Sequence, residues 1–321
     1  MKKFTPSFKA ILFCSLTFCT SSILNAQYKW DAGVNTGAAN YLGDIGGNAL
    51  TRRDFVSDMK LVETRMAAGT FVRYRIMHDV SIQGNLDWAR IAGDDKLSSN
   101  PARNARNLSF RNDLFELTAQ AQYVFYEVND LGHTYRYRNS FRAYVGLGAG
   151  AVYHNPKAEL NGDWIALRPL ETEGKKYSKV AAVIPATAGF YFTLNKHLRI
   201  GWSMTWRTTF TDYLDDVSTR YVDPSTLKSP AAVALANRTN ELDHVSPAFA
   251  ENFTPGNKRG DPTHNDSYLT STVDMSYVIR GHSSVAGARY PWISDRQNHP
   301  DKYNGIQKRV PILIRKKRYK W

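Results

Sequence analysis

The sequence predicts an all-β protein: an eight-stranded antiparallel transmembrane β-barrel with long external loops and a basic C-terminal extension. Three observations lead to this prediction. Eight segments alternate apolar and polar residues, the links between these segments alternate between short and long, and the chain begins with a segment typical of secretory signal peptides. Together these features are typical of bacterial outer-membrane barrels, whose strands place one face against lipid and the other toward a polar lumen.

Residues 1–26 are predicted to be a secretory signal peptide. Lys2 and Lys3 form a positive start, and residues 10–18 form a short apolar stretch. Ala26 is small enough for the position before a cleavage site, so cleavage is expected between Ala26 and Gln27. The apolar stretch is too short to be a stable membrane-spanning helix. The prediction therefore divides the chain into a signal peptide (1–26), an outer-membrane barrel (27–280) and a basic periplasmic tail (281–321).

Both cysteines of the chain lie in the predicted signal peptide. Cys19 would be the lipidated residue of a lipoprotein, but Phe18 is too bulky for the position before such a cysteine. Without Cys14 and Cys19 the mature chain has no thiol. Its stability must then come from a packed core or from a closed ladder of hydrogen bonds.

The alternation is clearest in residues 198–210. Ile200 and Met204 would point to one side, and Arg199, Ser203 and Arg207 to the other. One face suits lipid and the other suits a polar lumen. The same alternation predicts strands at residues 28–41, 69–77, 80–88, 113–125, 141–153, 180–193 and 268–279.

The links between the predicted strands alternate in length. Those near residues 78–79 and 194–196 are tight, and the link at 127–140 is moderate, whereas those at 42–68, 89–112, 154–179 and 211–267 are long. Outer-membrane barrels show this asymmetry, with short periplasmic turns and long external loops. Aromatic residues near the strand ends are expected to form girdles at the membrane interfaces. The alternative is that they are core residues of a soluble β-domain.

The basicity of the chain is concentrated in its C-terminal tail. Residues 280–321 contain eleven Lys and Arg against two Asp, interleaved with aromatic and aliphatic residues. A periplasmic protein partner is the preferred interpretation, ahead of anionic lipid headgroups and of a solvated tail. Nucleic acid is an unsuitable partner because an exported chain rarely meets it. The candidate partner-binding residues are Arg315, Lys316, Lys317, Arg318, Lys320 and Trp321.

No motif predicts an enzyme, a cofactor site or a small-molecule substrate. The histidines are scattered without the pair spacing of a metal site. Asp212, Asp215 and Asp216 are close enough in sequence to suggest calcium, but they lack the ordered spacing of a calcium loop, and capping of a polar loop is favoured. We therefore predict no catalytic, cofactor-binding or metal-binding residues. A lipid-modifying hydrolase in the outer membrane stays as a minor alternative.

Four stretches of the sequence together resemble the PorG family, an outer-membrane component of the type IX secretion system of Bacteroidetes. They occur in the same order as in that family, across roughly residues 28–280. The stretches are Asn40-Tyr41-Leu42-Gly43-Asp44-Ile45, Arg106-Asn107-Leu108-Ser109-Phe110-Arg111, Leu167-Arg168-Pro169-Leu170-Glu171-Thr172-Glu173-Gly174 and Thr209-Phe210-Thr211-Asp212-Tyr213-Leu214-Asp215-Asp216-Val217-Ser218.

The resemblance implies a non-enzymatic barrel in the outer membrane lipid. It would anchor or organise the periplasmic ring of the lipoprotein PorK and PorN, and so support protein secretion and, in some relatives, gliding motility. By the predicted topology the resembling stretches fall in external loops, where they would stabilise the barrel mouth. The mouth residues are Tyr41, Asp44, Asp212, Tyr213, Asp215 and Asp216, with Asp44 and Asp215 pairing with Arg52, Arg53 or Arg220. The alternative function is an independent surface barrel that acts as an adhesin or receptor through its loops.

Overall fold

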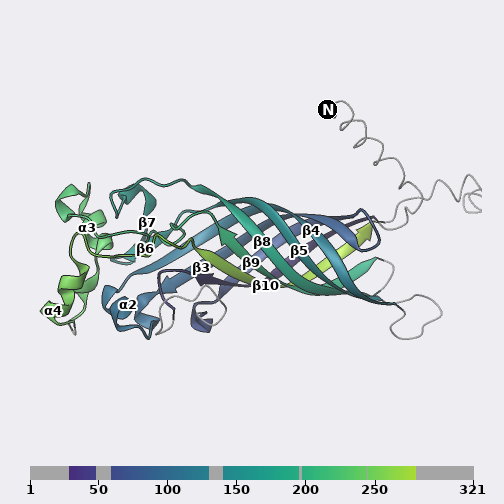
Figure 1. Cartoon of the computed structure of the whole chain (residues 1–321), viewed down its shortest axis with the longest axis horizontal. Helices are drawn as coiled ribbons and strands as arrows, with labels where there is room; N and C mark the ends of the chain where they lie inside the picture. Colours follow the sequence, from purple (N-terminus) through teal and green to yellow (C-terminus); the bar gives the residue numbers. More distant parts are fainter. Residues whose placement is uncertain (1–28, 48–58, 130–139, 195–196, 244, 280–321) are drawn as a thin grey trace, which may run out of the picture. The chain divides into compact units, whose positions relative to one another are not determined.

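The structure is a computed structural model that describes residues 29–47, 59–129, 140–194, 197–243 and 245–279. The described part is a closed barrel of eight antiparallel strands (Figure 1). The strands are β1 (Trp30–Leu42), β2 (Arg65–Arg75), β3 (Val80–Asp94), β4 (Ser109–Asn129), β5 (Ser140–Tyr153), β8 (Val180–Thr193), β9 (Leu198–Thr209) and β10 (Ser267–Ile279).

Each strand pairs with its neighbours in the chain, and β1 pairs with β10, which closes the barrel. All eight predicted strands are confirmed. Three of them extend further than the alternation predicted: β2 starts at Arg65, β3 continues to Asp94 and β4 starts at Ser109. These extensions carry charged residues on the outward face, such as Arg90 and Arg111. Because the ladder of β3 and β4 continues beyond the apolar band, the apolar pattern ends before the strands do.

The long links contain short elements that the alternation did not predict. A hairpin of β6 (Lys157–Leu160) and β7 (Asp163–Ala166) follows β5. The α-helices are α2 (Pro101–Arg106), α3 (Pro230–Ala236) and α4 (Pro247–Ala250), and the 3-10 turns are η2 (Leu61–Glu63), η3 (Asp95–Leu97), η4 (Arg168–Leu170), η5 (Pro224–Thr226), η6 (Thr239–Glu241) and η7 (Glu251–Phe253). No helix in the described ranges is both long enough and apolar enough to span a bilayer.

The two faces of the barrel wall have opposite polarity. On β9, Arg199 and Arg207 are buried inside the barrel, whereas Ile200 and Met204 are about one-third exposed on the outside. On β4, Leu117 is 66% exposed while Glu116 is 3% exposed. A soluble β-domain buries its apolar face, so the interpretation of these residues as the core of a soluble domain is wrong.

The outward apolar residues form a band bounded by aromatic side chains. On β4 the band runs from Phe115 to Phe125, both more than half exposed. Ten residue steps correspond to about 33 Å along a strand, and a tilt of about 40° reduces this to a height of about 25 Å. This is the height of the apolar band of outer-membrane barrels. The end of the barrel that carries the short link between β2 and β3 is called the turn end. There the Trp30 and Tyr74 ring centroids lie 4.6 Å apart on neighbouring strands.

The lumen is filled with polar side chains. Its middle layer contains Gln83, Gln120 and Thr187, and Thr187 donates to Gln120 at 2.8 Å. Nearer the turn end, Asp31 forms ion pairs with both Arg73 and Arg199. A cavity of about 30 Å³ is present in the lumen. This volume accommodates one or two water molecules, so the lumen is a packed interior and not a channel.

The two ends of the barrel differ as the sequence predicts. Trp30 of β1 pairs with Ile279 of β10, so the barrel begins and ends at the same end. The four-residue link between β2 and β3 lies there too. The described residues of the long links 43–64, 95–108, 154–179 and 210–266 lie at the opposite end (Figure 1).

Candidate functional site at the loop-covered mouth

The long loops fold over the barrel mouth on a shared apolar core. The strands contribute buried residues near their ends at the mouth, such as Ile91 and Val152, both 0% exposed. The loops contribute residues that pack on them, among them Leu108, Leu214 and Leu235. Burial of these side chains stabilises the loops on the barrel by about 1.5–3 kcal/mol for each large aliphatic residue. The mouth is therefore closed by a folded cap, which we define as the described residues of the four long links.

The six residues predicted to lie at the mouth are all found there. Tyr41 is at the end of β1, and Asp44 follows it in the first long loop. The four others lie in the loop after β9, and Tyr213 is the least buried of the six. The five that are buried are Tyr41, Asp44, Asp212, Asp215 and Asp216.

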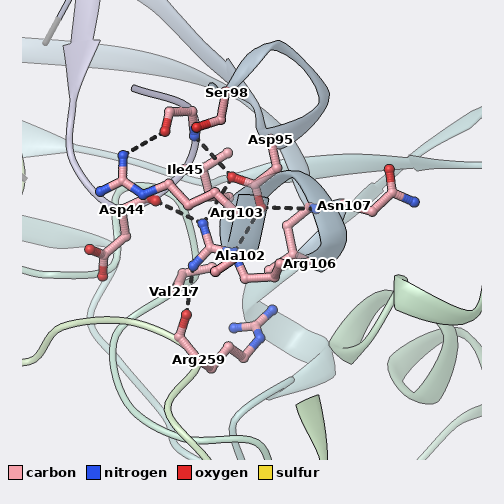
Figure 2. A network of polar contacts seen from close by, with 12 residues as sticks. Asp44, Ile45, Asp95, Ser98, Ala102, Arg103, Arg106, Asn107, Val217 and Arg259 are labelled. Carbon is pink, nitrogen blue, oxygen red and sulfur yellow. Dashed lines mark hydrogen bonds and ion pairs between the residues drawn. The ribbon is translucent and has the colours of Figure 1, made fainter. Parts of the chain in front are cut away.

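Arg106 is the centre of a network that joins three of the loops (Figure 2). It is the last residue of α2, and the next residue, Asn107, ends the helix with a positive φ of 58°. The Arg106 guanidinium binds both carboxylate oxygens of Asp95 at 2.7 and 2.9 Å. It also donates to the backbone carbonyls of Asp44 at 2.7 Å and Arg259 at 2.6 Å. A single buried side chain thus holds together the first, second and last long loops.

Arg259 extends the network to the third loop. Its guanidinium forms an ion pair with Glu173 at 2.9 Å and donates to the carbonyl of Asp216 at 2.6 Å. Glu173 also accepts the backbone N–H groups of Ser218 at 3.0 Å and Thr219 at 2.9 Å. Burial opposes the ionisation of Glu173, but Arg259 and these N–H donors outweigh it and lower the pKa of the carboxyl. Glu173 is therefore charged and fully bonded inside the cap.

A group of carboxylates surrounds the Tyr41 hydroxyl. This hydroxyl lies 2.7 Å from Asp215 and 2.6 Å from Asp266, and it accepts the backbone N–H of Asp44 at 3.1 Å. One hydroxyl proton cannot serve two carboxylates, so one of the two carboxyl groups must carry a proton of its own. Burial and the nearby Asp44 raise the pKa of Asp215 to about 7, and burial with the Asp215 charge raises that of Asp266.

Aromatic rings stack beside this group. The ring centroids of Tyr213 and Tyr177 lie 4.6 Å apart with the rings nearly parallel, and the His154 ring also stacks on Tyr177, at 5.9 Å. The Tyr177 hydroxyl donates to Asp216 at 2.6 Å. Burial lowers the pKa of His154 to about 4, so its ring is neutral at pH 7. The stack therefore joins the loop after β5 to the loop after β9.

The ion pairs expected for Asp215 differ from those found. Among the described residues, Asp215 is bound by Tyr41 and by the backbone N–H groups of Ile45 and Val217. Arg220 donates to the carbonyl of Gly256 at 2.7 Å instead. The reason is that Arg220 lies in the exposed bridge that pairs with Lys258, outside the buried group. Arg52 and Arg53 are outside the described residues.

Several residues of the network were not singled out from the sequence, namely Asp95, Arg106, Glu173, Arg259 and Asp266. Two of them, Arg106 and Glu173, lie within the stretches that carry the family resemblance, so that signal was available. Asp95, Arg259 and Asp266 carry no local pattern that would mark them. In the structure the network joins all four resembling stretches, which are far apart in sequence.

The cap contains no arrangement that suggests catalysis. A His-Asp-Glu group that could hold a metal does occur, at the opposite end of the barrel, where His78, Asp79 and Glu127 converge. There Arg142 already forms an ion pair with Glu127 at 2.6 Å. The predicted cleavage residues Ala26 and Gln27 and the candidate partner-binding residues 315–321 lie outside the described residues.

The chain was compared with solved structures. It is similar to Ail, the attachment invasion locus protein of Yersinia pestis, at 10% identity, covering 78% of this chain and 99% of that one with a TM-score of 0.32. It is similar to Neisserial surface protein A at 8% identity, covering 78% and 97% with a TM-score of 0.35. For OprG of Pseudomonas aeruginosa the values are 11% identity, 80% and 99% coverage and a TM-score of 0.33.

Comparison with curated proteins finds no match. Comparison with family models finds a match. The model for DUF6089, described as a domain of unknown function, matches residues 9–231, which is more than half of the chain and includes β1 to β9 with the loops of the cap up to α3. The chain therefore belongs to the DUF6089 family.

Proposed function

We propose that this protein is an outer-membrane barrel. The inverted polarity of its wall supports this placement, because the outward apolar band of about 25 Å matches the hydrocarbon thickness that such barrels span. In water a band of this size would expose large apolar side chains all around the barrel, including Leu117, Leu147 and Met275, each more than half exposed. The long-loop end with its cap would face outward and the turn end would face the periplasm.

We further propose that it is a non-enzymatic component of the type IX protein secretion system. In this role it anchors or organises the PorK–PorN ring, and it supports protein secretion and, in gliding bacteria, motility. One observation carries this proposal: the four stretches that resemble the PorG family meet in one buried network, with Asp44 joined to Arg106 and Glu173 joined to Arg259. Stretches that are far apart in the sequence are thus joined to one another in the fold.

The structure suits an anchor better than a channel. The lumen holds a cavity of only about 30 Å³ among its polar side chains, and the cap adds a packed core over one end. A closed barrel with a rigid cap is a fixed platform in the membrane. Any transported protein would have to pass through another component.

The periplasmic end is where a ring would bind. In the described turn between β2 and β3, Met77 is 63% exposed and His78 and Asp79 are also exposed. The basic residues Arg315–Arg318 and Lys320 follow β10, which ends at this same end. These cations suit acidic patches on a periplasmic partner.

The test is co-purification from detergent-solubilised outer membranes. Full-length tagged protein should recover PorK and PorN, and a strain lacking the gene should retain secreted cargo in the periplasm. A variant with Arg315, Lys316, Lys317, Arg318 and Lys320 changed to Gln should recover less of both ring proteins. Its matched control changes exposed lysines of the cap, Lys175, Lys176 and Lys228, to Gln and should recover the ring fully.

Two outcomes would contradict this proposal. If the full-length protein recovers no ring component after crosslinking in cells, the anchoring role is wrong. If secretion is normal in the deletion strain but attachment to surfaces or hosts is lost, the protein is the alternative, an adhesin or receptor that uses its cap.

A further inference from the structure

A groove of about 330 Å³ lies on the outside of the barrel, next to the cap. It is formed where β3, β4, β5 and β6 meet. Its residues occupy two tiers along the strands. The tier nearer the middle of the barrel is aromatic and consists of Trp88, Phe115 and Tyr153. The outer tier is charged and contains Arg90, Asp113 and Lys157.

The aromatic tier marks the depth of the groove. Phe115 pairs across the strands with both Trp88 and Tyr153, so the three rings form one row. One outward position closer to the middle of the barrel, the residues are aliphatic, with Leu86 58% and Leu117 66% exposed. Aromatic rows of this kind lie at the boundary between hydrocarbon and headgroups. The charged tier therefore lies at headgroup depth.

Arg90 is held in place before any ligand binds. Its Nε and Nη2 atoms lie 2.7 and 3.1 Å from the two carboxylate oxygens of Asp113. Its guanidinium also lies over the Trp88 ring, 5.7 Å from the centroid. These contacts engage one edge of the guanidinium, and no described residue accepts from Nη1. A planar guanidinium with a second edge turned outward is suited to phosphate oxygens.

Lys157 and Arg111 make the groove cationic. Lys157 starts β6 and is the register partner of Arg111 on β4. Within the described part of the chain, no carboxylate forms an ion pair with Lys157. Two cations and one carboxylate thus line the groove. Arg111, whose guanidinium stacks 3.9 Å from the centroid of the Trp164 ring, adds a third cation next to it.

We propose that this groove binds a phosphate of an outer-leaflet glycolipid. Arg90 and Lys157 would donate to the phosphate oxygens, and the acyl chains would lie along Phe115 and Leu117. The aromatic side chains lie nearer the middle of the barrel and the cations nearer the cap. This order matches the acyl chains and the phosphate of such a lipid. The long-loop end, where the groove lies, is the end that contacts the outer leaflet. This proposal rests on the outer-membrane placement proposed above and does not depend on a role in secretion.

The test measures how much lipid the full-length protein retains. The protein is reconstituted in phosphatidylethanolamine vesicles that contain either bisphosphorylated lipid A or the same lipid A without phosphates. Bound lipid is then counted by native mass spectrometry after extraction into detergent. Wild-type protein should retain the phosphorylated form preferentially. Changing Arg90→Gln and Lys157→Gln together should reduce its retention roughly 25-fold, because each cation near an anionic headgroup contributes about a factor of five.

The matched control is Lys60→Gln with Arg65→Gln, which removes two cations at the same end of the barrel on the β1–β2 side and should keep full retention. Lys157→Gln alone leaves the Arg90–Asp113 pair intact and should still weaken retention. Equal retention of both forms of lipid A, full retention by the Arg90 and Lys157 variant, or displacement by an equal amount of phosphatidylglycerol would each overturn the proposal. Failure of the wild-type protein to insert into any vesicle would instead overturn the membrane placement, and the groove proposal with it.

Discussion

The hydroxyl of Tyr41 lies 2.7 Å from a carboxylate oxygen of Asp215, although the two residues are 174 positions apart in the chain. Tyr41 ends the first strand of the barrel and Asp215 lies in the last long loop. Both side chains are buried, at 5% and 0% exposure. This contact fastens the cap to the barrel wall at the point where the first resembling stretch meets the fourth.

Removing the Tyr41 hydroxyl should loosen the cap without unfolding the barrel. Tyr41→Phe leaves Asp215 and Asp266 without their shared partner, and an unsatisfied buried polar group costs about 1–3 kcal/mol. We expect trypsin to cut the loops faster than in the wild type, while the strands stay protected. The control is Tyr123→Phe, whose outward hydroxyl forms no hydrogen bond with a described residue. Equal cleavage of the two variants would show that the bond does not hold the cap.

The cap should become less stable as the pH rises. Asp215 has a folded-state pKa of about 7, raised mainly by burial and by Asp44, against about 3.8 in the unfolded chain. The folded state therefore binds the proton more tightly, so its stabilising effect is complete below about pH 4 and is lost as the pH rises through 7. Asp266 and Tyr41 share this site, and the Arg106 charge opposes the shift in part.

This pH dependence can be measured as the rate of loop proteolysis between pH 5 and 8 with a protease active across that range. The rate should rise with pH in the wild type. Asp215→Asn keeps a neutral group in place and should make the profile less steep, while Asp216, whose pKa is raised by burial to about 6, still titrates in this range. A wild-type rate that stays constant or falls with pH would contradict this linkage, because Glu173, whose pKa is shifted downward, is ionised in the folded and the unfolded state throughout this range and adds no slope.

An arginine placed in the outward band should destabilise the protein only if that band faces lipid. Leu147→Arg lies at mid-band on β5, where Leu147 pairs with Ala121 of β4, and should cost about 2–4 kcal/mol. Leu97→Arg makes the same change at an exposed position of the cap, 44% exposed, and should be nearly neutral. Unfolding by urea in lipid vesicles compares the two. Near-zero effects for both changes would mean that the band does not contact lipid.

Breaking the central ion pair of the cap should be costly. Asp95 is 0% and Arg106 6% exposed. Arg106→Met leaves the Asp95 charge buried without its partner, which typically costs about 3–5 kcal/mol. Adding Asp95→Asn should recover part of the loss because it removes that charge. Hydrogen exchange of the loops 95–108 and 210–266 reports both effects, and a single variant with unchanged exchange would contradict the central role of Arg106.

The barrel should conduct no ions in a planar bilayer. The lumen contains the packed Gln83, Gln120 and Thr187 layer and a cavity of only about 30 Å³. Steady conductance steps from purified protein at neutral pH would show that the lumen opens. A preparation of an open porin, reconstituted under the same conditions, provides the positive control.

The sequence alone was sufficient to predict the strands of the barrel wall and which of their side chains face the lumen. Alternation in residues 198–210 assigned Arg207 to the lumen and Met204 to the outside, because in a strand the backbone pleat places successive side chains on opposite faces. The side that a residue occupies is thus a local property. The same reasoning found all eight strands, but it ended β3 at Trp88 because beyond that residue the outward side chains become charged.

The contacts within the cap, in contrast, depend on the tertiary structure. The sequence marked Tyr41, Asp44 and Asp215 as mouth residues, but it did not show that Arg106 would bind Asp95 or that Arg259 would bind Glu173. These pairs join loops that are distant in the chain, and no local periodicity relates them. Their geometry depends on the barrel closing first and bringing four strand ends together. The wall follows from the chemistry of neighbouring residues, whereas the cap follows from where closure of the barrel places its loops.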